Sequence, residues 1–271
     1  MNYQTFQPRP ELETLVRFYW TLEVPFDPNN KKQKIIPDGN IEMTFNLADP
    51  IKRYVSDNEF LLHPCGMVMG QRTKSYYIEP VGHVDSFAIC FYAHGFANFI
   101  NHSLHTLVDK EIPIEDLFGR ETSENLIQRM MQASDTQNRI HIIEAFLLNK
   151  LKEPKTIDSI VKNTIDTLVL TKGSTPIGKL LKENPSKRRQ LERKFTEQIG
   201  LSPKQLGKVI RIQSALHAIL NKKEVSLTEI AHEHEYHDQA HFTKDFKEFI
   251  GVSPKDFLNN DNMMLSAAFY K

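Results

Sequence analysis

Apolar and polar side chains alternate along much of the first 110 residues. Within 33–47, a Pro-Asp-Gly turn is followed by an alternating run that includes Ile41, Met43 and Phe45. Residues 75–91 carry two similar runs on either side of a Pro-Val-Gly turn. A period of two places every second side chain on the same face of a strand. The pattern therefore predicts that this part of the chain is mainly β-structure.

The period changes to that of a helix further along the chain. Residues 95–102 fit a short helix, and residues 122–152 fit two helices with a break near Ser134 and Asp135. Apolar residues three and four positions apart mark the buried side of each helix. We therefore expect a helical connector after the β-rich part, over residues 121–155.

From residue 156 onward, every apolar run has helical spacing. A short helix is predicted over 177–183, and a basic helix after Pro185. A longer helix begins at Pro203, where Ser202 is a suitable N-cap and proline suits the first helical position. This part of the chain is therefore expected to be all-α.

The elements together predict an α+β fold. The chain has 271 residues, which is enough for two domains, and 40% hydrophobic with 25% charged residues is typical of a globular protein. The expected parts are a β-rich domain, a helical connector and an all-α domain, over residues 1–120, 121–155 and 156–260.

The strongest feature of the all-α part is an internal repeat. The stretch FTEQIGLSPKQL (195–206) aligns with FKEFIGVSPKDF (246–257), 51 residues later, and seven of the twelve positions are identical. Each copy consists of a short helix, a turn, a second helix and then Gly-x-Ser-Pro-Lys. This is the organisation of a helix-turn-helix motif used twice, with a long helix between the copies.

Charge is distributed unevenly between the two copies, although the formal net charge of the whole chain is zero. Residues 186–211 carry eight basic and two acidic side chains, a net charge of +6. Residues 226–257 carry three basic and seven acidic side chains, a net charge of −4. Clustered basic residues are typical of a surface that binds a polyanion, but charge alone favours an ordinary solvated helix face. If the doubled motif binds DNA, the first copy should supply most of the salt-dependent affinity.

Helical spacing separates an inward stripe from an outward face in each second helix. The inward stripes are Leu191, Phe195 and Ile199 in the first copy and Phe242, Phe246 and Phe249 in the second. The candidate DNA-binding residues lie on the outward faces and on the long helix: Lys187, Arg188, Arg189, Glu192, Arg193, Thr196, Lys204, Lys208, Gln239, Thr243, Lys244 and Lys247. Arginine pairs with guanine, glutamine with adenine, and the threonine methyl contacts thymine.

These motifs resemble the DNA-binding domain of the AraC/XylS family of bacterial transcription regulators. The similarity covers about residues 156–258, and its most specific parts are RRQLERKFTEQIGLSPKQL and HDQAHFTKDFKEFIGVSPKDF. It implies two helix-turn-helix subdomains that enter successive major grooves on one face of the duplex. One departure is Glu235, where the family usually has glycine, so a positive φ would carry a steric cost there. The first turn also has about one residue more than usual.

The first half resembles, more loosely, the β-rich sensory domain of one branch of the same family. The similar stretches are IIPDGNIEMTFNL, GQRTKSYYIEP, FAICFYAHGFANFI and DLFG. The resemblance implies a cupin-like or related β fold. Asp38 and Glu42 flank a turn beside a strand, so their carboxylates are candidates for a ligand-binding cavity, whereas Asp38-Gly39 alone is typical of a plain turn.

Four histidines in the second motif, His232, His234, His237 and His241, raise the question of a metal site. A zinc-protease helix needs His-Glu-x-x-His, but Tyr236 stands where the second histidine is required. We favour a structural role for these residues, with Asp238 as the N-cap of the following helix. The sequence therefore predicts no metal, no cofactor and no catalytic residue.

The predicted function is that of a sequence-specific DNA-binding transcription regulator, modulated by a small ligand or by dimerisation through the first domain. Its partner is double-stranded DNA, with a small-molecule effector, RNA polymerase and a second copy as further candidates. No signal peptide or membrane span is predicted, which favours the cytoplasm. Two alternatives remain: a metal-dependent enzyme in the β domain with a DNA-targeting tail, and a regulator whose β half only dimerises.

Overall fold

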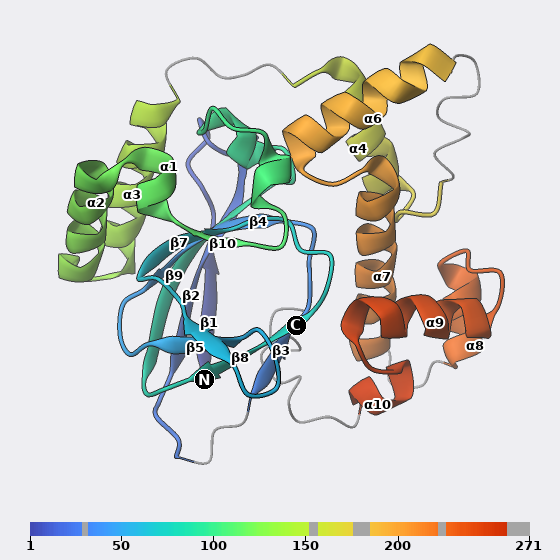
Figure 1. The fold of residues 1–271 in the computed structure, drawn as a ribbon, viewed down its shortest axis with the longest axis horizontal. Helices are drawn as coiled ribbons and strands as arrows, with labels where there is room; N and C mark the ends of the chain where they lie inside the picture. The colour runs from blue at the N-terminus through green and yellow to red at the C-terminus, as the bar shows by residue number, and fades with distance from the viewer. Residues whose placement is uncertain (29–31, 152–156, 176–184, 222–225, 259–271) are drawn as a thin grey trace. The chain divides into compact units, whose positions relative to one another are not determined.

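The structure is a computed structural model, and it divides into two compact units (Figure 1). The first unit contains residues 1–32, 40–71 and 78–156, and the second contains residues 33–39, 72–77 and 157–271. The residues that the structure describes are 1–28, 32–151, 157–175, 185–221 and 226–258. Strands lie in the first part of the chain and helices dominate the last part, so the predicted α+β fold class is confirmed.

The larger sheet has six antiparallel strands in the order β1-β2-β9-β4-β7-β10. These strands are β1 (Asn2–Phe6), β2 (Val16–Val24), β4 (Ile41–Asn46), β7 (Gly66–Met69), β9 (Val84–Phe91) and β10 (Glu111–Pro113). Ile41, Met43 and Phe45 on β4 are fully buried, as the alternation predicted. Thr44 between them is buried too, so both faces of this strand are covered.

A smaller sheet has the strand order β3-β8-β5-β6. Its strands are β3 (Gln33–Ile35), β5 (Ile51–Tyr54), β6 (Phe60–Leu62) and β8 (Tyr76–Pro80). Strands β5 and β6 form an antiparallel hairpin in which Lys52 lies opposite Leu62 and Tyr54 lies opposite Phe60. The predicted turn before β4 is present, because Gly39 adopts φ +82°.

The helices of the first unit share a core with the larger sheet. They are the 3-10 helices η1 (Gly95–Asn98) and η2 (Leu104–Leu107) and the α-helices α1 (Ile114–Phe118), α2 (Arg120–Gln132) and α3 (Thr136–Lys150). Asp135 caps α3 and accepts a hydrogen bond of 2.8 Å from the Asn138 N–H, so the predicted break is confirmed. Met130 on α2 and Ile143 on α3 belong to the same buried cluster as Phe87 on β9. The segment that we expected as a connector therefore helps to build the first unit.

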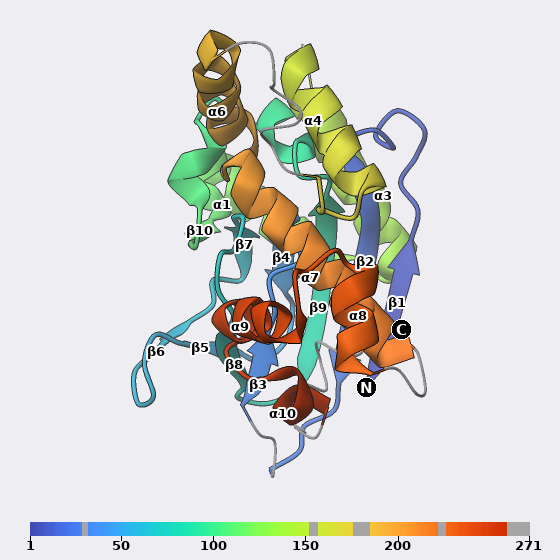
Figure 2. The same ribbon diagram turned by 90° about the vertical axis from the view of Figure 1, so that its right-hand side faces the viewer.

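The second unit is built around a long helix. Its helices are α4 (Ser159–Leu170), α6 (Pro185–Ile199), α7 (Pro203–Asn221), α8 (Leu227–Glu233), α9 (Gln239–Ile250) and α10 (Pro254–Leu258). Figure 2 shows α7 running from the end of α6 to the pair formed by α8 and α9. The short helix predicted over 177–183 lies outside the described residues. Among the helices that are described, none is long and apolar enough to cross a membrane.

Candidate nucleic-acid interface

Helix α6 presents one apolar stripe to the interior of the second unit. Leu191, Phe195 and Ile199 recur every four residues, and all three are fully buried. Gly200 then adopts φ +93°, a conformation that ends a helix at little cost because glycine has no Cβ. The predicted inward stripe is therefore confirmed, and the opposite face of α6 is available to a ligand.

The opposite face of α6 is basic. Its predicted contact residues are Arg188, Arg189, Glu192 and Arg193, which are exposed, and Thr196, which is half-buried. The side chain of Lys187 lies outside the described residues. Arg188 Nε lies 3.2 Å from Glu192 Oε1, and Arg193 Nη1 lies 3.9 Å from Glu197 Oε2. Exposed ion pairs of this kind contribute at most about 1 kcal/mol, so a DNA phosphate can replace the carboxylate.

An ion pair ties α6 to α4. The Lys194 ammonium donates to the carboxylate of Asp158, which also caps α4 by accepting a 3.1 Å hydrogen bond from the Ile160 N–H. The bond from Lys194, together with the one from Ile160, holds the pKa of Asp158 below its usual value. Lys194 is therefore directed toward α4, which separates it from the arginines of the outward face.

The two predicted lysines of α7 differ in their surroundings. Lys204 is exposed near the start of the helix. Lys208 is half-buried, and its Nζ lies 3.2 Å from Asp245 Oδ1 and 3.1 Å from Glu248 Oε2, both on α9. These ion pairs give Lys208 a role inside the domain, where it links α7 to α9.

Two caps define the helices of the second motif. A capping box begins α8: the Glu229 N–H donates to Ser226 Oγ at 3.1 Å, and the Ser226 N–H donates to Glu229 Oε2 at 3.1 Å. Asp238 caps α9, as predicted, by accepting a 2.7 Å hydrogen bond from the His241 N–H. This bond, followed by the contact with His237, lowers the pKa of Asp238.

The turn between α8 and α9 stores backbone strain. Glu235 adopts φ +55°, a region that a residue with a Cβ enters only at a cost. The steric cost expected at this position is therefore present. Tyr236, the next residue, is buried, and its ring centre lies 5.2 Å from that of Phe242 and 5.4 Å from that of His241. These aromatic contacts hold the turn closed and offset part of the strain.

Helix α9 buries a phenylalanine stripe: Phe242 and Phe246 are fully buried, and Phe249 is nearly so. The opposite side of the helix is its outward face. The predicted contact residues on this face are Gln239, Lys244 and Lys247, which are exposed, and Thr243, which is half-buried. The Oε1 of Gln239 accepts a 2.8 Å hydrogen bond from the Thr228 hydroxyl on α8. This bond orients the Gln239 amide at the start of α9.

Asp245 gathers positive groups at the junction of α7 and α9. Its carboxylate lies 3.2 Å from Lys208 Nζ, 3.5 Å from Arg211 Nη2 and 3.8 Å from His241 Nε2. The Arg211 guanidinium also lies 4.2 Å from the centre of the Tyr236 ring. Basic side chains of α7 therefore offset acidic side chains of α9. The only sign of this cluster in the sequence is a basic segment followed by an acidic one.

The four histidines of the second motif have different surroundings. His232 lies on α8 and is exposed, whereas His234 follows α8 and is buried. His237 precedes α9, and its side chain is 87% exposed. His241 lies on α9 and faces Asp245. The structure thus distributes these side chains over two helices and the turn between them, as parts of the motif.

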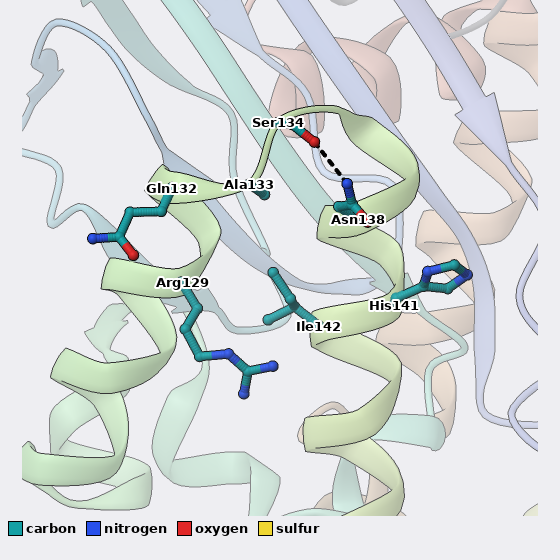
Figure 3. Close-up of a pocket in the computed structure, with 7 residues that line it drawn as sticks. All are labelled: Arg129, Gln132, Ala133, Ser134, Asn138, His141 and Ile142. Atoms are coloured by element: carbon teal, nitrogen blue, oxygen red, sulfur yellow. Dashed lines mark hydrogen bonds between the residues drawn. The ribbon is translucent and has the colours of Figure 1, made fainter.

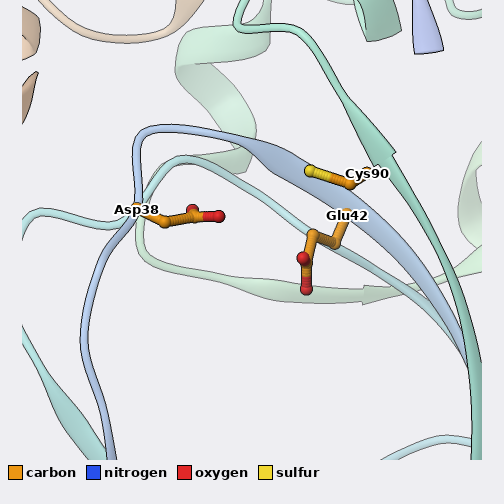
Figure 4. Close-up of side chains that lie close together, drawn as sticks. All are labelled: Asp38, Glu42 and Cys90. Atoms are coloured by element: carbon orange, nitrogen blue, oxygen red, sulfur yellow. The ribbon is translucent and has the colours of Figure 1, made fainter. Parts of the chain in front are cut away.

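Of the two candidate ligand residues, Asp38 lies in the turn that precedes β4, and Glu42 lies on β4 itself. Figure 4 draws Asp38, Glu42 and Cys90. Glu42 and Cys90 are register partners on β4 and β9, and their ligand atoms lie within 4.8 Å of each other. The Trp20 indole N–H donates a 3.1 Å hydrogen bond to Glu42, and Trp20 itself is buried. Glu42 therefore accepts the hydrogen bond of a buried indole, and the ligand-binding role expected for Asp38 and Glu42 stays a prediction.

A shallow groove of about 420 Å³ lies between the end of α2 and the start of α3 (Figure 3). Arg129 and His141 contribute to its lining, and the Asn138 amide donates a 2.7 Å hydrogen bond to the Ser134 hydroxyl. These four side chains are exposed to solvent. The groove is therefore an open surface feature of the first unit.

Two family models match separate parts of the chain. Residues 4–113 match a domain of unknown function, DUF6597, and residues 182–260 match a helix-turn-helix domain. The second match contains α6, α7, α8, α9 and α10. These motifs define a DNA-binding domain of the kind found in transcription regulators. Residues 182–260 belong to the helix-turn-helix domains of the AraC type, the family that the sequence resembles.

Solved structures of ToxT from Vibrio cholerae are similar along nearly the whole chain. A structure at 1.65 Å gives a TM-score of 0.47 with 11% identity and covers 96% of this chain and 98% of ToxT. A structure of wild-type ToxT with bound unsaturated fatty acid gives a TM-score of 0.43 with 15% identity and covers 88% of this chain and 93% of that one. No curated protein is significantly similar to the chain in sequence.

Proposed function

We propose that this chain is a sequence-specific transcription regulator that inserts α6 and α9 into successive major grooves of DNA. The observation that supports this most strongly is the doubled motif, in which each second helix buries an apolar stripe and exposes a polar face. Helix α7 joins the two and has 19 residues, so it is roughly 28 Å long. That length is close to the roughly 34 Å between major grooves on one face of the duplex.

Helix α6 is the main source of affinity in this proposal. Arg189 and Arg193 are exposed one turn apart on the outward face, where each can pair with guanine or with a phosphate. Arg188 and Lys204 neutralise further phosphates at the edges of the groove. The same side chains make binding strongly dependent on salt, because each neutralised phosphate releases a counterion.

Helix α9 reads bases with less help from charge. Gln239 suits adenine and the methyl group of Thr243 suits thymine, while Lys244 and Lys247 reach the phosphates. Asp245 and Glu248 do not repel DNA strongly, because the positive charges of Lys208 and Arg211 lie beside them. We accordingly assign Lys208 to the positioning of α9.

The first unit is the regulatory part in this proposal, acting through a small ligand or through self-association. It has its own buried cluster, which fits an autonomous sensory domain. A ligand can control DNA binding only if it favours one state of the chain over another. Thermal shifts of the full chain across a small-molecule panel that includes unsaturated fatty acids would detect such a ligand.

Selection of bound duplexes from a random DNA pool tests the function directly. The full chain should enrich one recurring site with two short elements about one helical turn apart. The variant Gln239→Ala should relax one element and leave the other intact. An enriched pool that is no different from the input would refute sequence-specific binding.

A further inference from the structure

Strand β6 is an exposed edge of the smaller sheet. It is last in the order β3-β8-β5-β6, so β5 is its neighbour on one side. Phe60, Leu61 and Leu62 are 44%, 61% and 55% exposed, which is unusual for three consecutive large apolar side chains. Edge strands with such side chains are open to pairing with another strand.

The hydrogen-bond pattern fixes which backbone groups face outward. The Val55 N–H donates to the Glu59 carbonyl, and the His63 N–H donates to the Ile51 carbonyl, both at 2.9 Å. Backbone groups alternate in direction along a strand. Residues 59, 61 and 63 therefore direct their N–H and C=O groups toward β5, whereas residues 60 and 62 direct theirs away from it.

The edge strand is short, but it lacks the charged and proline residues that commonly protect such an edge against pairing. Proteins commonly place lysine, proline or an inward-pointing charge on such a strand. Here the strand is Phe-Leu-Leu, and the charges of neighbouring β5 are already neutralised: Lys52 lies 3.2 Å from Glu79, and Arg53 lies 3.3 Å from Glu111. No uncompensated charge on β5 repels an approaching apolar strand.

We propose that β6 pairs antiparallel with β6 of a second copy of this chain, with the two-fold axis at Leu61. In this register, Phe60 of each copy lies opposite Leu62 of the other, and their outward N–H and C=O groups form a hydrogen-bonded pair. Leu61 meets its own counterpart as a non-hydrogen-bonded pair, in which side chains are closest. Two copies related in this way use one surface twice, as a closed dimer requires.

A second copy suits this edge because the register is self-complementary. Residue 59 lies opposite residue 63, so Glu59 faces a histidine position and not another carboxylate. The apolar positions 60, 61 and 62 face one another. Since the strand has only three residues, we expect weak association that becomes significant at high concentration or when two copies are held near each other.

Cysteine cross-linking at Leu61 tests the proposed register on the full chain in the absence of DNA. A non-hydrogen-bonded antiparallel pair has a Cα–Cα distance of about 4.5 Å, which a disulfide can span. Leu61→Cys should therefore form a disulfide-linked dimer on mild oxidation. Phe60→Cys and Leu62→Cys should each yield at least about fivefold less, because each lies opposite a different residue.

The matched control is Val55→Cys, on the same hairpin and 49% exposed, with wild type as the control for Cys65 and Cys90. Both should remain essentially monomeric after oxidation. Equal dimer yields from Leu61→Cys and Val55→Cys, or none from Leu61→Cys, would overturn the proposal. Leu61→Lys should also reduce self-association in sedimentation at high concentration. Cross-linking is measured without DNA, so its failure is distinguishable from a failure of DNA binding.

Discussion

The two helix-turn-helix motifs have the same pattern of buried residues but different exposed residues. In both, the second helix buries three apolar residues, and the glycine that follows adopts a positive φ, +93° at Gly200 and +86° at Gly251. In both, the next helix starts at a Ser-Pro pair. The buried stripe and the caps therefore specify the motif, whereas the exposed residues decide what it can bind.

The acidic residues of α6 and of α9 have their cationic partners in different places. On α6, Glu192 and Glu197 lie near arginines of the same helix, at exposed positions. On α9, Asp245 and Glu248 are paired with residues of α7. Loss of an ion pair that joins two helices and is partly buried is costly to the domain. An exposed ion pair within one helix contributes little to stability. The net charge of the second motif therefore underestimates its capacity to bind DNA.

Reversal of charge on α6 should have the largest effect on DNA binding. The double variant Arg189→Glu/Arg193→Glu should weaken binding at least about 100-fold and flatten the salt dependence, since two cationic contacts become repulsive. Titration of labelled DNA at several salt concentrations measures both. Arg120→Glu/Arg129→Glu on α2 reverses two exposed arginines and should leave binding unchanged; equal losses in the two double variants would contradict the assignment.

Removal of Asp245 should destabilise the second motif. Asp245→Ala leaves the half-buried Lys208 and Arg211 without their shared carboxylate, and the free energy of unfolding should fall by about 1–2 kcal/mol. Urea denaturation followed by circular dichroism measures this change. Glu248→Ala removes the exposed member of the cluster, 65% exposed, and should cost less than about 0.5 kcal/mol. A larger loss in Glu248→Ala would reverse our account of the cluster.

Relief of backbone strain at Glu235 should stabilise the protein, whereas removal of Asp245 should destabilise it. Glu235→Gly removes the Cβ at a residue with φ +55°, so the protein should gain about 1 kcal/mol in stability. A higher urea midpoint would show it. Glu233→Gly, at the last residue of α8, is the matched control, and it should destabilise slightly because glycine disfavours the helical conformation. Destabilisation by Glu235→Gly would show that the positive φ is not a source of strain.

A single lysine of α9 should matter less for binding. Lys244→Ala should weaken binding about two- to fivefold and lower the salt slope by about one, the change expected for one phosphate contact. The loss should be similar for all DNA sequences, which competition with unrelated duplexes would reveal. A loss comparable to that of the arginine double variant would remove the distinction between the motifs.

The cap of α9 should contribute the smallest effect, visible only in acid. The His241 N–H lowers the pKa of Asp238 in the folded state, so its contribution is present above the unfolded pKa of about 3.9 and is lost as pH falls through the folded pKa. Asp238→Asn retains a cap without the ionisation. The urea midpoints of the two proteins should agree near pH 7, and wild type should lose more below about pH 4. Parallel curves would contradict this role.

Local patterns predicted much of the fold. The alternation on β4, the break at Asp135 and the repeat with its caps were all evident from residues close together in the sequence. Strands β1 and β2 lie in the part that was predicted to be β, but they were not located individually, because charged residues such as Arg17 and Glu23 interrupt the apolar pattern of β2. A mixed pattern of this kind has no clear period to detect.

Contacts between residues far apart in the sequence could not be predicted at the candidate site. Lys208 was assigned to DNA because it is a lysine on a helix beside a basic motif. Its carboxylate partners on α9 are distant in the sequence, and only the folded chain brings them together. The same applies to the contact of Arg211 with Tyr236. The type of a residue indicates what it can bind, but its neighbours decide whether that charge is available.

The most direct test of the central claim is hydroxyl-radical footprinting of the full chain on its selected DNA site. If α6 and α9 both enter the duplex, two protected patches should appear on one face, about 10 base pairs apart. Arg189→Glu/Arg193→Glu should remove both patches, whereas Gln239→Ala should weaken only the patch of α9. A single protected patch that is unaffected by changes in α9 would contradict the use of both motifs.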